Sequence, residues 1–551
     1  MRSAFPTMLA VAILIAFSFS SASAQQTPPD LILFNGRVFT SNAGQPYVEA
    51  LAIRGERILA VGTSKEIVTV AGKETRRIDL RGHTVIPGIN DAHQHLAVGP
   101  QTYELPIKNM DPQWKEITES LASVVATIPK GTWISATFGP TVLDDPQATR
   151  FALDKVAPDN PVLLRDLTWH AALLNTRAVQ KLSFRQDEPN PEGGFLVRNP
   201  ADGSLTGMVF EFASFQVSRR FSELASQQEA EQQLSQLFDQ AEHWGITTVQ
   251  DMASPITQKS CADLLAKVPP PIRVRIIWFG LTDQHGRMTK EDHATSVDPA
   301  PLVMARGTKW VLDGTPVERS AAMRKPYTDR PATSGTLDFP QNEIEDILRE
   351  SLQSHEQLML HVVGDHTTEV LLDAMDATGG KDVWGKRRVR IEHGDGITPD
   401  LMRRVRELGL VVVVNPAHLT LPELFTKRFG ADRAAQLLPV RSLLEAGISM
   451  AIGTDGPINP YLNIMFAATD PERPKEAITR EQVVIAYTQG SAYAEFTDND
   501  KGTLEPGKVA DLAVLSQDIF HIPLNELPKT ESVLTLVGGK VVYDAKVLGV
   551  W

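Results

Sequence analysis

The middle of the chain alternates short apolar runs with amphipathic stretches, and this alternation constrains the fold more than any other feature. The stretches at residues 227–243 and 342–355 have the length of helices. Parallel strands need helical crossovers between them, so the alternation indicates βα units. Eight candidate strands predict an α/β fold built on a (β/α)8 TIM-like barrel. They are residues 84–92, 247–252, 272–279, 308–313, 358–363, 389–393, 410–415 and 448–453.

Both ends of the chain are β-rich and differ in character from the middle. Residues 31–40 alternate apolar and polar positions around Asn35-Gly36, a pair that favours a hairpin turn. Near the other end, residues 532–543 form two short runs about a Gly-Gly pair. We therefore expect a small discontinuous β-sandwich domain built from residues 25–83 and 500–551, with the barrel at residues 84–499.

The first two candidate strands are separated by an unusually long interval. A βα connection is normally short, so residues 97–246, about 150 in number, must form an inserted unit. An insertion after the first strand emerges at the carboxyl-terminal face of a barrel, where active sites form. We interpret it as a cap over the pocket; a passive surface excursion is the alternative.

The N-terminus has the pattern of a secretory signal. Arg2 precedes the apolar run Met8 to Phe19, and small residues ending at Ala24 follow it. We expect a signal peptide at residues 1–24 and export to the periplasm or the exterior. The run is short for a membrane span of ~20 residues, so we expect no stable membrane insertion after cleavage. An uncleaved anchor is the alternative.

Charge and cysteine content exclude several classes of function. The net charge of −13 is spread without long runs, which disfavours nucleic acids and anionic membrane surfaces as partners. Cys261 is the one cysteine, so a metal would be held by histidines and carboxylates. Cys261 falls in an expected helix at residues 257–267, and no G-x-S-x-G elbow is present, which disfavours a cysteine or serine nucleophile. A homo-oligomer is compatible with the sequence.

Polar groups that can bind a metal follow several of the apolar runs. His93 and His95 are two residues apart, and a strand places such residues on the same side. Each group alone has an ordinary structural role; an aspartate after Gly-Thr, for example, is a common turn or helix cap. On one barrel, all of them would point at the same mouth. The candidate ligands are His93, His95, Lys309, His361, His393 and Asp455.

These motifs, in this order, resemble the amidohydrolase superfamily of metal-dependent hydrolases. More specifically, the chain is similar to the branch that includes N-substituted formamide deformylases and YtcJ-like proteins, and the similarity covers nearly the whole mature chain. A long insertion after the first strand is also typical of that branch. The motifs are NGRVFT (35–40), PGINDAHQH (87–95), WHAALLNTRAV (169–179), GITTVQDM (245–252), KWVLDG (309–314), HVVGDH (361–366), RIEHGD (390–395), GTDGP (453–457) and KGTLEPGKVADLAVL (501–515).

The resemblance implies a role for each candidate ligand. His93 and His95 would hold one divalent cation, and His361 and His393 a second. Lys309 would be carboxylated on its amine and bridge the two ions. Zn²⁺ suits this histidine-rich set best. A mononuclear site with unmodified Lys309 is the alternative, and Gln94 departs from the commoner residue between the two histidines of the family motif.

The resemblance also implies two catalytic residues. Asp455 would ligate metal and accept the proton of the attacking water. His170 would reach the pocket from the insertion and hydrogen-bond the substrate carbonyl or the oxyanion that develops from it. The alternative for His170 is a structural role near the helix cap at Asn175-Thr176.

The function expected from this reasoning is exported, metal-dependent hydrolysis of a small amide-like molecule. Hydroxide activated by the metal would attack a carbonyl and cleave a non-peptide C–N bond of the amide or N-acyl type. A mononuclear metal deaminase, or a hydrolase of cyclic amides or esters, on the same barrel is the alternative. A non-catalytic exported binding protein is a further one. We expect the cap to determine specificity, with His418 and residues 425–429 lining the entrance.

Overall fold

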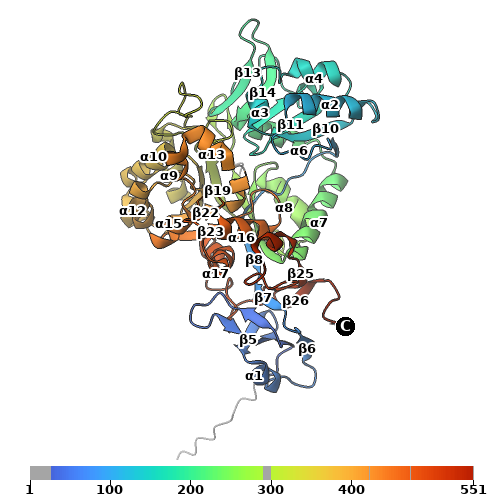
Figure 1. The fold of residues 1–551 in the computed structure, drawn as a ribbon, viewed down its shortest axis with the longest axis vertical. Helices are drawn as coiled ribbons and strands as arrows, with labels where there is room; N and C mark the ends of the chain where they lie inside the picture. Colours follow the sequence, from blue (N-terminus) through green and yellow to red (C-terminus); the bar gives the residue numbers. More distant parts are fainter. Residues whose placement is uncertain (1–26, 289–298, 421, 472, 550–551) are drawn as a thin grey trace, which may run out of the picture.

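The computed structural model describes residues 27–288, 299–420, 422–471 and 473–549. The signal peptide predicted at residues 1–24 lies outside these ranges. At the centre is a sheet of eight parallel strands, in the order β23-β22-β21-β20-β19-β16-β15-β8 (Figure 1). The strands are β8 (Ile89–Gln94), β15 (Ile246–Ala253), β16 (Arg273–Phe279), β19 (Val303–Val311), β20 (Leu358–Val362), β21 (Arg390–His393), β22 (Val411–Val414) and β23 (Ser449–Ile452).

The first and last strands of this sheet meet, so that the sheet forms a nearly closed barrel. Just after β23, the backbone N–H of Asp455 donates to the carbonyl oxygen of His93 on β8 at 3.0 Å. The neighbouring N–H of Thr454 donates to the carboxylate of Asp91 at 2.9 Å. The prediction of an α/β fold with a (β/α)8 barrel is confirmed.

The first candidate strand differs from its prediction. Instead of one strand over residues 84–92, the chain forms β7 (Thr84–Pro87) and β8, which belong to different sheets. Gly88 separates them, and a Cβ atom there would lie 2.1 Å from the Thr247 hydroxyl. The close approach of Thr247 therefore requires glycine at the junction, where the chain leaves one sheet and enters the other.

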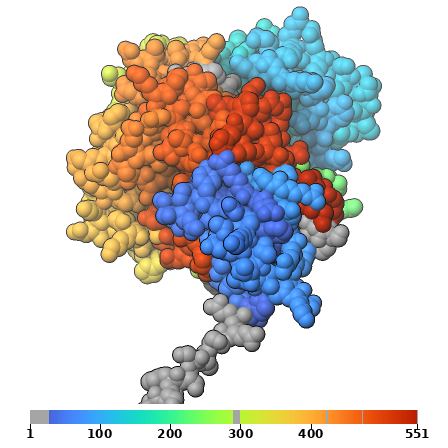
Figure 2. All heavy atoms as spheres, turned by 60° about the horizontal axis from the view of Figure 1, so that its bottom comes forward, coloured from blue at the N-terminus to red at the C-terminus, as the bar shows by residue number. Residues whose placement is uncertain are grey.

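Strands from the two ends of the chain pair with one another. One sheet has the order β26-β25-β24-β7-β2-β3, and a second has the order β5-β4-β1-β6. The N-terminal segment (blue) and the C-terminal strands (red) accordingly pack together in Figure 2. The strands are β1 (Leu31–Phe34), β2 (Arg37–Phe39), β3 (Tyr47–Val48), β4 (Ala50–Arg54), β5 (Arg57–Gly62), β6 (Arg76–Asp79), β24 (Leu512–Leu515), β25 (Ser532–Val537) and β26 (Lys540–Asp544). The domain boundaries at residues 83 and 500 stay predictions.

Between β8 and β15 the chain builds a separate sheet with the order β13-β14-β12-β11-β10-β9, at the top of Figure 1. Buried apolar side chains on both faces give it cores distinct from that of the barrel. Its strands are β9 (Thr102–Glu104), β10 (Trp133–Phe138), β11 (Val162–Asp166), β12 (Ala171–Leu174), β13 (Gly194–Arg198) and β14 (Leu205–Glu211). Its helices are α2 (Trp114–Val125), α3 (Pro140–Leu143), α4 (Arg150–Val156), α5 (Thr176–Lys181) and α6 (Phe212–Ser222).

Helices surround the barrel strands. The stretches predicted as helices at residues 227–243 and 342–355 form α7 (Gln227–His243) and α9 (Gln341–Ser354). In the described part of the chain, none of the helices has the length and apolar character needed to cross a membrane. The other helices are α1 (Ser64–Thr69), α8 (Gln258–Lys267), α10 (Asp365–Ala377), α11 (Gly380–Trp384), α12 (Pro399–Glu407), α13 (Pro422–Phe429), α14 (Ala431–Ala434), α15 (Val440–Glu445), α16 (Pro460–Thr469), α17 (Arg480–Ile485) and α18 (Ser491–Ala494).

Candidate metal centre

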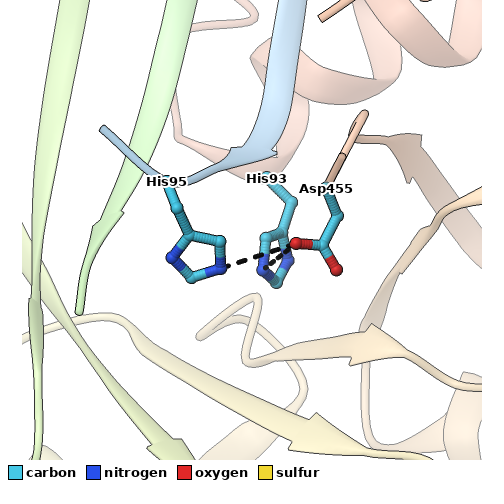
Figure 3. Close-up of side chains that lie close together, drawn as sticks. All are labelled: His93, His95 and Asp455. Carbon is cyan, nitrogen blue, oxygen red and sulfur yellow. Dashed lines mark ion pairs between the residues drawn. The ribbon is translucent and has the colours of Figure 1, made fainter. Parts of the chain in front are cut away.

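The Asp455 carboxylate lies at the centre of a cluster of imidazoles at the carboxyl-terminal end of the barrel. Its Oδ1 is 3.8 Å from His93 Nε2 and 3.5 Å from His95 Nε2, and the three side chains converge in Figure 3. These distances are too long for hydrogen bonds. They are close to the separation of about 3.3–3.6 Å between ligand atoms around a tetrahedral cation with bonds of about 2.0–2.2 Å.

The His93 ring is oriented by a buried charge pair. Its Nδ1 donates to Glu392 Oε2 at 2.7 Å, which leaves the Nε2 lone pair directed toward the cluster. Arg390 Nε and Nη2 donate to the two oxygens of the same carboxylate at 2.7 and 3.0 Å. Burial raises the pKa of Glu392, but the Arg390 charge and the His93 hydrogen bond lower it to a net value below its usual range. Glu392 therefore stays ionised and fixes the tautomer of His93.

The His95 ring is oriented by different groups. Its Nδ1 lies 2.8 Å from the carbonyl oxygen of Met252 and 2.9 Å from Ser254 Oγ. Nδ1–H is thus the donor to the Met252 carbonyl, and Nε2 faces Asp455. Burial lowers the pKa of His95 to about 3. The ring is neutral near pH 7, which is the form that binds metal.

Lys309, on β19, reaches the same cluster. Its Nζ lies 2.9 Å from His93 Nε2 in a buried position. Burial lowers the pKa of the Lys309 amine to about 8. The amine is therefore neutral in a larger fraction of molecules than an exposed lysine would be.

A second group of histidines faces the other oxygen of Asp455. His393 Nδ1 and His418 Nε2 each lie 3.7 Å from Oδ2. His393 Nδ1 also lies 2.8 Å from Asn415 Oδ1, the acceptor that orients its ring. The residues His393, His418 and Asp455 form a second group of potential ligands. The sequence pointed to His418 only as an entrance residue.

His361 joins the cluster through its ring instead of through Asp455. The His361 ring centroid is 4.5 Å from that of His393 and 4.7 Å from that of His170. Its Nε2 is buried without a hydrogen-bond partner among the described residues. Leaving a buried polar atom unpaired costs about 1–3 kcal/mol, and a cation would give this nitrogen a partner. The unpaired nitrogen and the thiolate-free set of donors both fit a divalent cation such as Zn²⁺.

His170 lies in the loop between β11 and β12 of the insertion, and it reaches the metal centre. Its Nδ1 donates to Glu211 Oε2 at 2.5 Å, and its ring also packs against Phe215 at a centroid distance of 5.1 Å. Burial lowers the pKa of His170, but the Glu211 carboxylate raises it to a net value above the ordinary one. The insertion therefore contributes a buried imidazole that faces His361.

All the residues singled out from the sequence thus lie around one centre, five of them within 4 Å of a partner in the cluster. Sequence reasoning missed Glu211 and Glu392, which orient His170 and His93. Glu392 precedes His393 in the RIEHGD motif, and this is the one signal that could have drawn attention to it.

A parallel barrel that gathers histidines and an aspartate at the carboxyl ends of its strands defines a metal-dependent hydrolase of the TIM-barrel class. The chain belongs to the amidohydrolase family, because residues 76–543 match the model described as "Amidohydrolase family". It is therefore an enzyme of the metal-dependent amidohydrolase type, which acts on carbon–nitrogen bonds. The resemblance noted from the motifs is confirmed.

Individual relatives match over almost their whole length. The chain is 29% identical over 549 residues to "Protein LONG AFTER FAR-RED 3" of Arabidopsis thaliana, covering 94% of this chain and 93% of that protein. It is 26% identical over 560 residues to "N-substituted formamide deformylase" of Arthrobacter pascens, covering 94% and 98%. The fold is similar to that of an uncharacterized metal-dependent hydrolase from Pyrococcus furiosus, with a TM-score of 0.66 and 23% identity, covering 89% and 99%.

Proposed function

We propose that this enzyme hydrolyses a non-peptide amide or N-acyl bond of a small molecule. The observation that carries the proposal is the position of Asp455, whose two oxygens face two separate groups of histidines. The similarity to an N-substituted formamide deformylase supports an amide as substrate. Hydrolysis of an amide needs a polarised carbonyl, an activated water and a proton for the leaving amine.

We propose Zn²⁺ as the metal, in one or two copies. His93, His95 and Asp455 would hold one ion, and His361 and His393 would hold the second, with a carboxylated Lys309 between them. A bound Zn²⁺ ion supplies Lewis-acid polarisation of the carbonyl and lowers the pKa of water. Burial of the Lys309 amine, which favours its neutral form, supports carboxylation because only the neutral amine can attack CO₂.

Asp455 moves the proton in this proposal. The charges of the surrounding histidines hold its pKa well below the usual range, although burial alone would raise it. The carboxylate is therefore ionised and can accept a proton from the attacking water. The same carboxyl group then delivers that proton to the amine that leaves.

His170 stabilises the developing negative charge. The Glu211 carboxylate holds Nδ1–H, and the raised pKa of His170 favours the doubly protonated ring. Nε2–H can then donate to the carbonyl oxygen of a substrate bound beside His361. A donor positioned in advance in this way contributes about 3–4 kcal/mol to the stabilisation of such a transition state.

Replacement of Asp455 tests the proposal. Asp455→Asn keeps an oxygen ligand but cannot accept a proton, so we expect metal content to be retained while turnover of a panel of N-acyl amines falls at least 100-fold. Metal per chain is measured by inductively coupled plasma mass spectrometry. Asp498→Asn, at a partly exposed ion pair with Arg388, is the matched control. A mutant with near-wild-type turnover would contradict the role of Asp455.

A mononuclear site is supported by one contact. The Lys309 amine lies at hydrogen-bond distance from His93 Nε2, as expected of an unmodified lysine. One metal per chain together with a lysine of unmodified mass would favour the alternative, deamination of a ring or hydrolysis of a cyclic amide or ester. Two metals and a gain of one CO₂ unit on Lys309 would favour the amidase proposal.

We also propose that the protein is exported to the periplasm or secreted, on the basis of the signal pattern at residues 1–24. Cell fractionation with mass analysis of the mature N-terminus tests this proposal. Full-length protein found only in the cytosol would contradict it.

A further inference from the structure

A cavity of about 260 Å³ lies where the insertion meets the barrel. Its wall includes residues 97–102, which follow β8, together with side chains of α6 and the loop after β11. A volume of this size is below that of pockets for drug-sized ligands, which begin at ~300 Å³. It suits one substituent of a substrate instead of the whole molecule.

The cavity adjoins the metal centre at three points along the chain. Ala97 lines it and is two residues from His95, within about 7 Å along the backbone. Pro255 lines it and directly follows Ser254, whose hydroxyl lies 2.9 Å from His95 Nδ1. Trp169 lines it and directly precedes His170. A substituent in the cavity can therefore belong to a molecule whose reacting bond lies at the metal centre.

One lining residue, Arg165 of β11, carries a charge that the protein does not neutralise. Its Nε is buried without a hydrogen-bond partner, and no carboxylate in the described ranges forms an ion pair with it. Its guanidinium carbon lies 5.3 Å from the ring centroid of Trp169 and 4.9 Å from that of Phe221. Burial lowers the pKa of Arg165 to about 10, so the group is still charged at neutral pH.

Other polar groups of the cavity wall already have partners. The Gln233 side chain accepts from the Gly99 N–H at 3.0 Å and donates to the Gly99 carbonyl at 2.8 Å. Ser222 Oγ donates to the Val98 carbonyl at 2.6 Å. The residues that line the cavity include no aspartate or glutamate. A buried charge without a counterion is costly, so Arg165 is the group whose energy an anionic ligand would improve most.

We propose that Arg165 binds a carboxylate on the substrate, so that this enzyme prefers amides whose substituent ends in a carboxylate. The inference rests on the proposed amide hydrolysis for the reaction, but the binding site stands on the cavity itself. A guanidinium can donate two parallel hydrogen bonds to a carboxylate. Its stacking between two aromatic rings fixes the plane of the guanidinium and thereby the direction of approach of the ligand.

Binding of a matched pair of ligands tests the proposal without turnover. The probes are 3-phenylpropanoate and 3-phenylpropan-1-ol, titrated calorimetrically into the metal-loaded protein. We expect the wild type to bind the carboxylate at least tenfold more tightly than the alcohol. Arg165→Gln should weaken binding of the carboxylate at least tenfold and leave binding of the alcohol unchanged. Carboxylate bound directly by metal is common to both proteins, so it does not contribute to the difference between them.

Two further variants complete the design. Arg165→Lys keeps the charge without the two-pronged donor and should give an intermediate affinity, and it carries the test if Arg165→Gln does not fold. Arg177→Gln, an arginine on the surface of the insertion whose side chain is 52% exposed, is the matched control and should bind as the wild type does. Equal affinity of the wild type for the two ligands, or an unchanged preference in Arg165→Gln, would overturn the proposal.

The two proposals fail separately. If the carboxylate preference depends on Arg165 but no amide is hydrolysed, the proposed reaction is wrong and the site remains. If neutral amides are hydrolysed and the carboxylate gives no advantage, the reaction remains and the site is wrong.

Discussion

At the scale of single residues, the metal centre is defined as much by the groups behind the ligands as by the ligands. His93 and His170 each donate Nδ1–H to a buried glutamate, at 2.7 Å and 2.5 Å. Both glutamates are far from their histidines in the sequence, and neither stands in a pattern that signals a metal. A contact across 299 residues, as between His93 and Glu392, follows from strand order and not from local spacing.

Replacing Glu392 should weaken metal binding. Glu392→Gln removes the charge that fixes the His93 tautomer and leaves Arg390 without a counterion, so we expect affinity for Zn²⁺ to fall about 10–100-fold. Competition with a metallochromic chelator measures this affinity. Glu495→Gln is the matched control, because Glu495 is equally buried in an ion pair with Lys501 at 2.7 Å but orients no proposed ligand. An affinity that falls equally in both variants would show a general effect of stability.

At the scale of elements, the barrel strands were predictable because strands buried on both faces are continuous apolar runs. The strand ends also indicated the ligands, since parallel strands present their carboxyl ends at one face. The exception was the division of residues 84–92 into β7 and β8. The apolar pattern continues across Gly88, and only the contact with Thr247 shows why the chain changes sheets there. Arg165 likewise gave no sequence signal, because an unpaired charge is visible only when its surroundings are known.

Helix α7 carries a carboxylate that should make the stability of the fold depend on pH. Burial and the nearby Asp239 raise the pKa of Glu242 to about 7. The folded protein then binds a proton that the unfolded chain releases above a pKa of about 4.3, so the free energy of unfolding falls as pH rises from about 4 to 7. Glu242→Gln removes this loss. We expect the variant to be more stable than the wild type at pH 8, by about 1 kcal/mol, and to show little difference at pH 4.

Urea unfolding of both proteins at pH 4 and pH 8 measures this effect. Glu231→Gln serves as the control, since Glu231 lies on the same helix and accepts a hydrogen bond from Gln227. Its stability relative to the wild type should not change between the two pH values. A Glu242→Gln variant that gains no stability at high pH would contradict the burial argument.

At the scale of the whole molecule, the metal centre lies at the seam where the barrel closes. Asp455 follows the last strand, its N–H donates to the first strand at His93, and its carboxylate faces ligands from both sides of this seam. A cation held there would join β8 to the loop after β23. The catalytic cluster and the closure of the barrel are therefore expected to be thermodynamically coupled.

Removal of metal should loosen this seam selectively. Dialysis against EDTA should lower the melting temperature, and Zn²⁺ at about 100 times its Kd should restore about 2.7 kcal/mol of stability by mass action. Amide hydrogen exchange should accelerate in β8 and around Asp455, since the seam loses its cross-link. Strands β10 and β11 of the insertion, which have their own core, provide the internal control and should exchange as before. Identical exchange at the seam with and without chelator would separate closure of the barrel from metal binding, and would leave the backbone hydrogen bond from Asp455 to His93 as the contact that closes it.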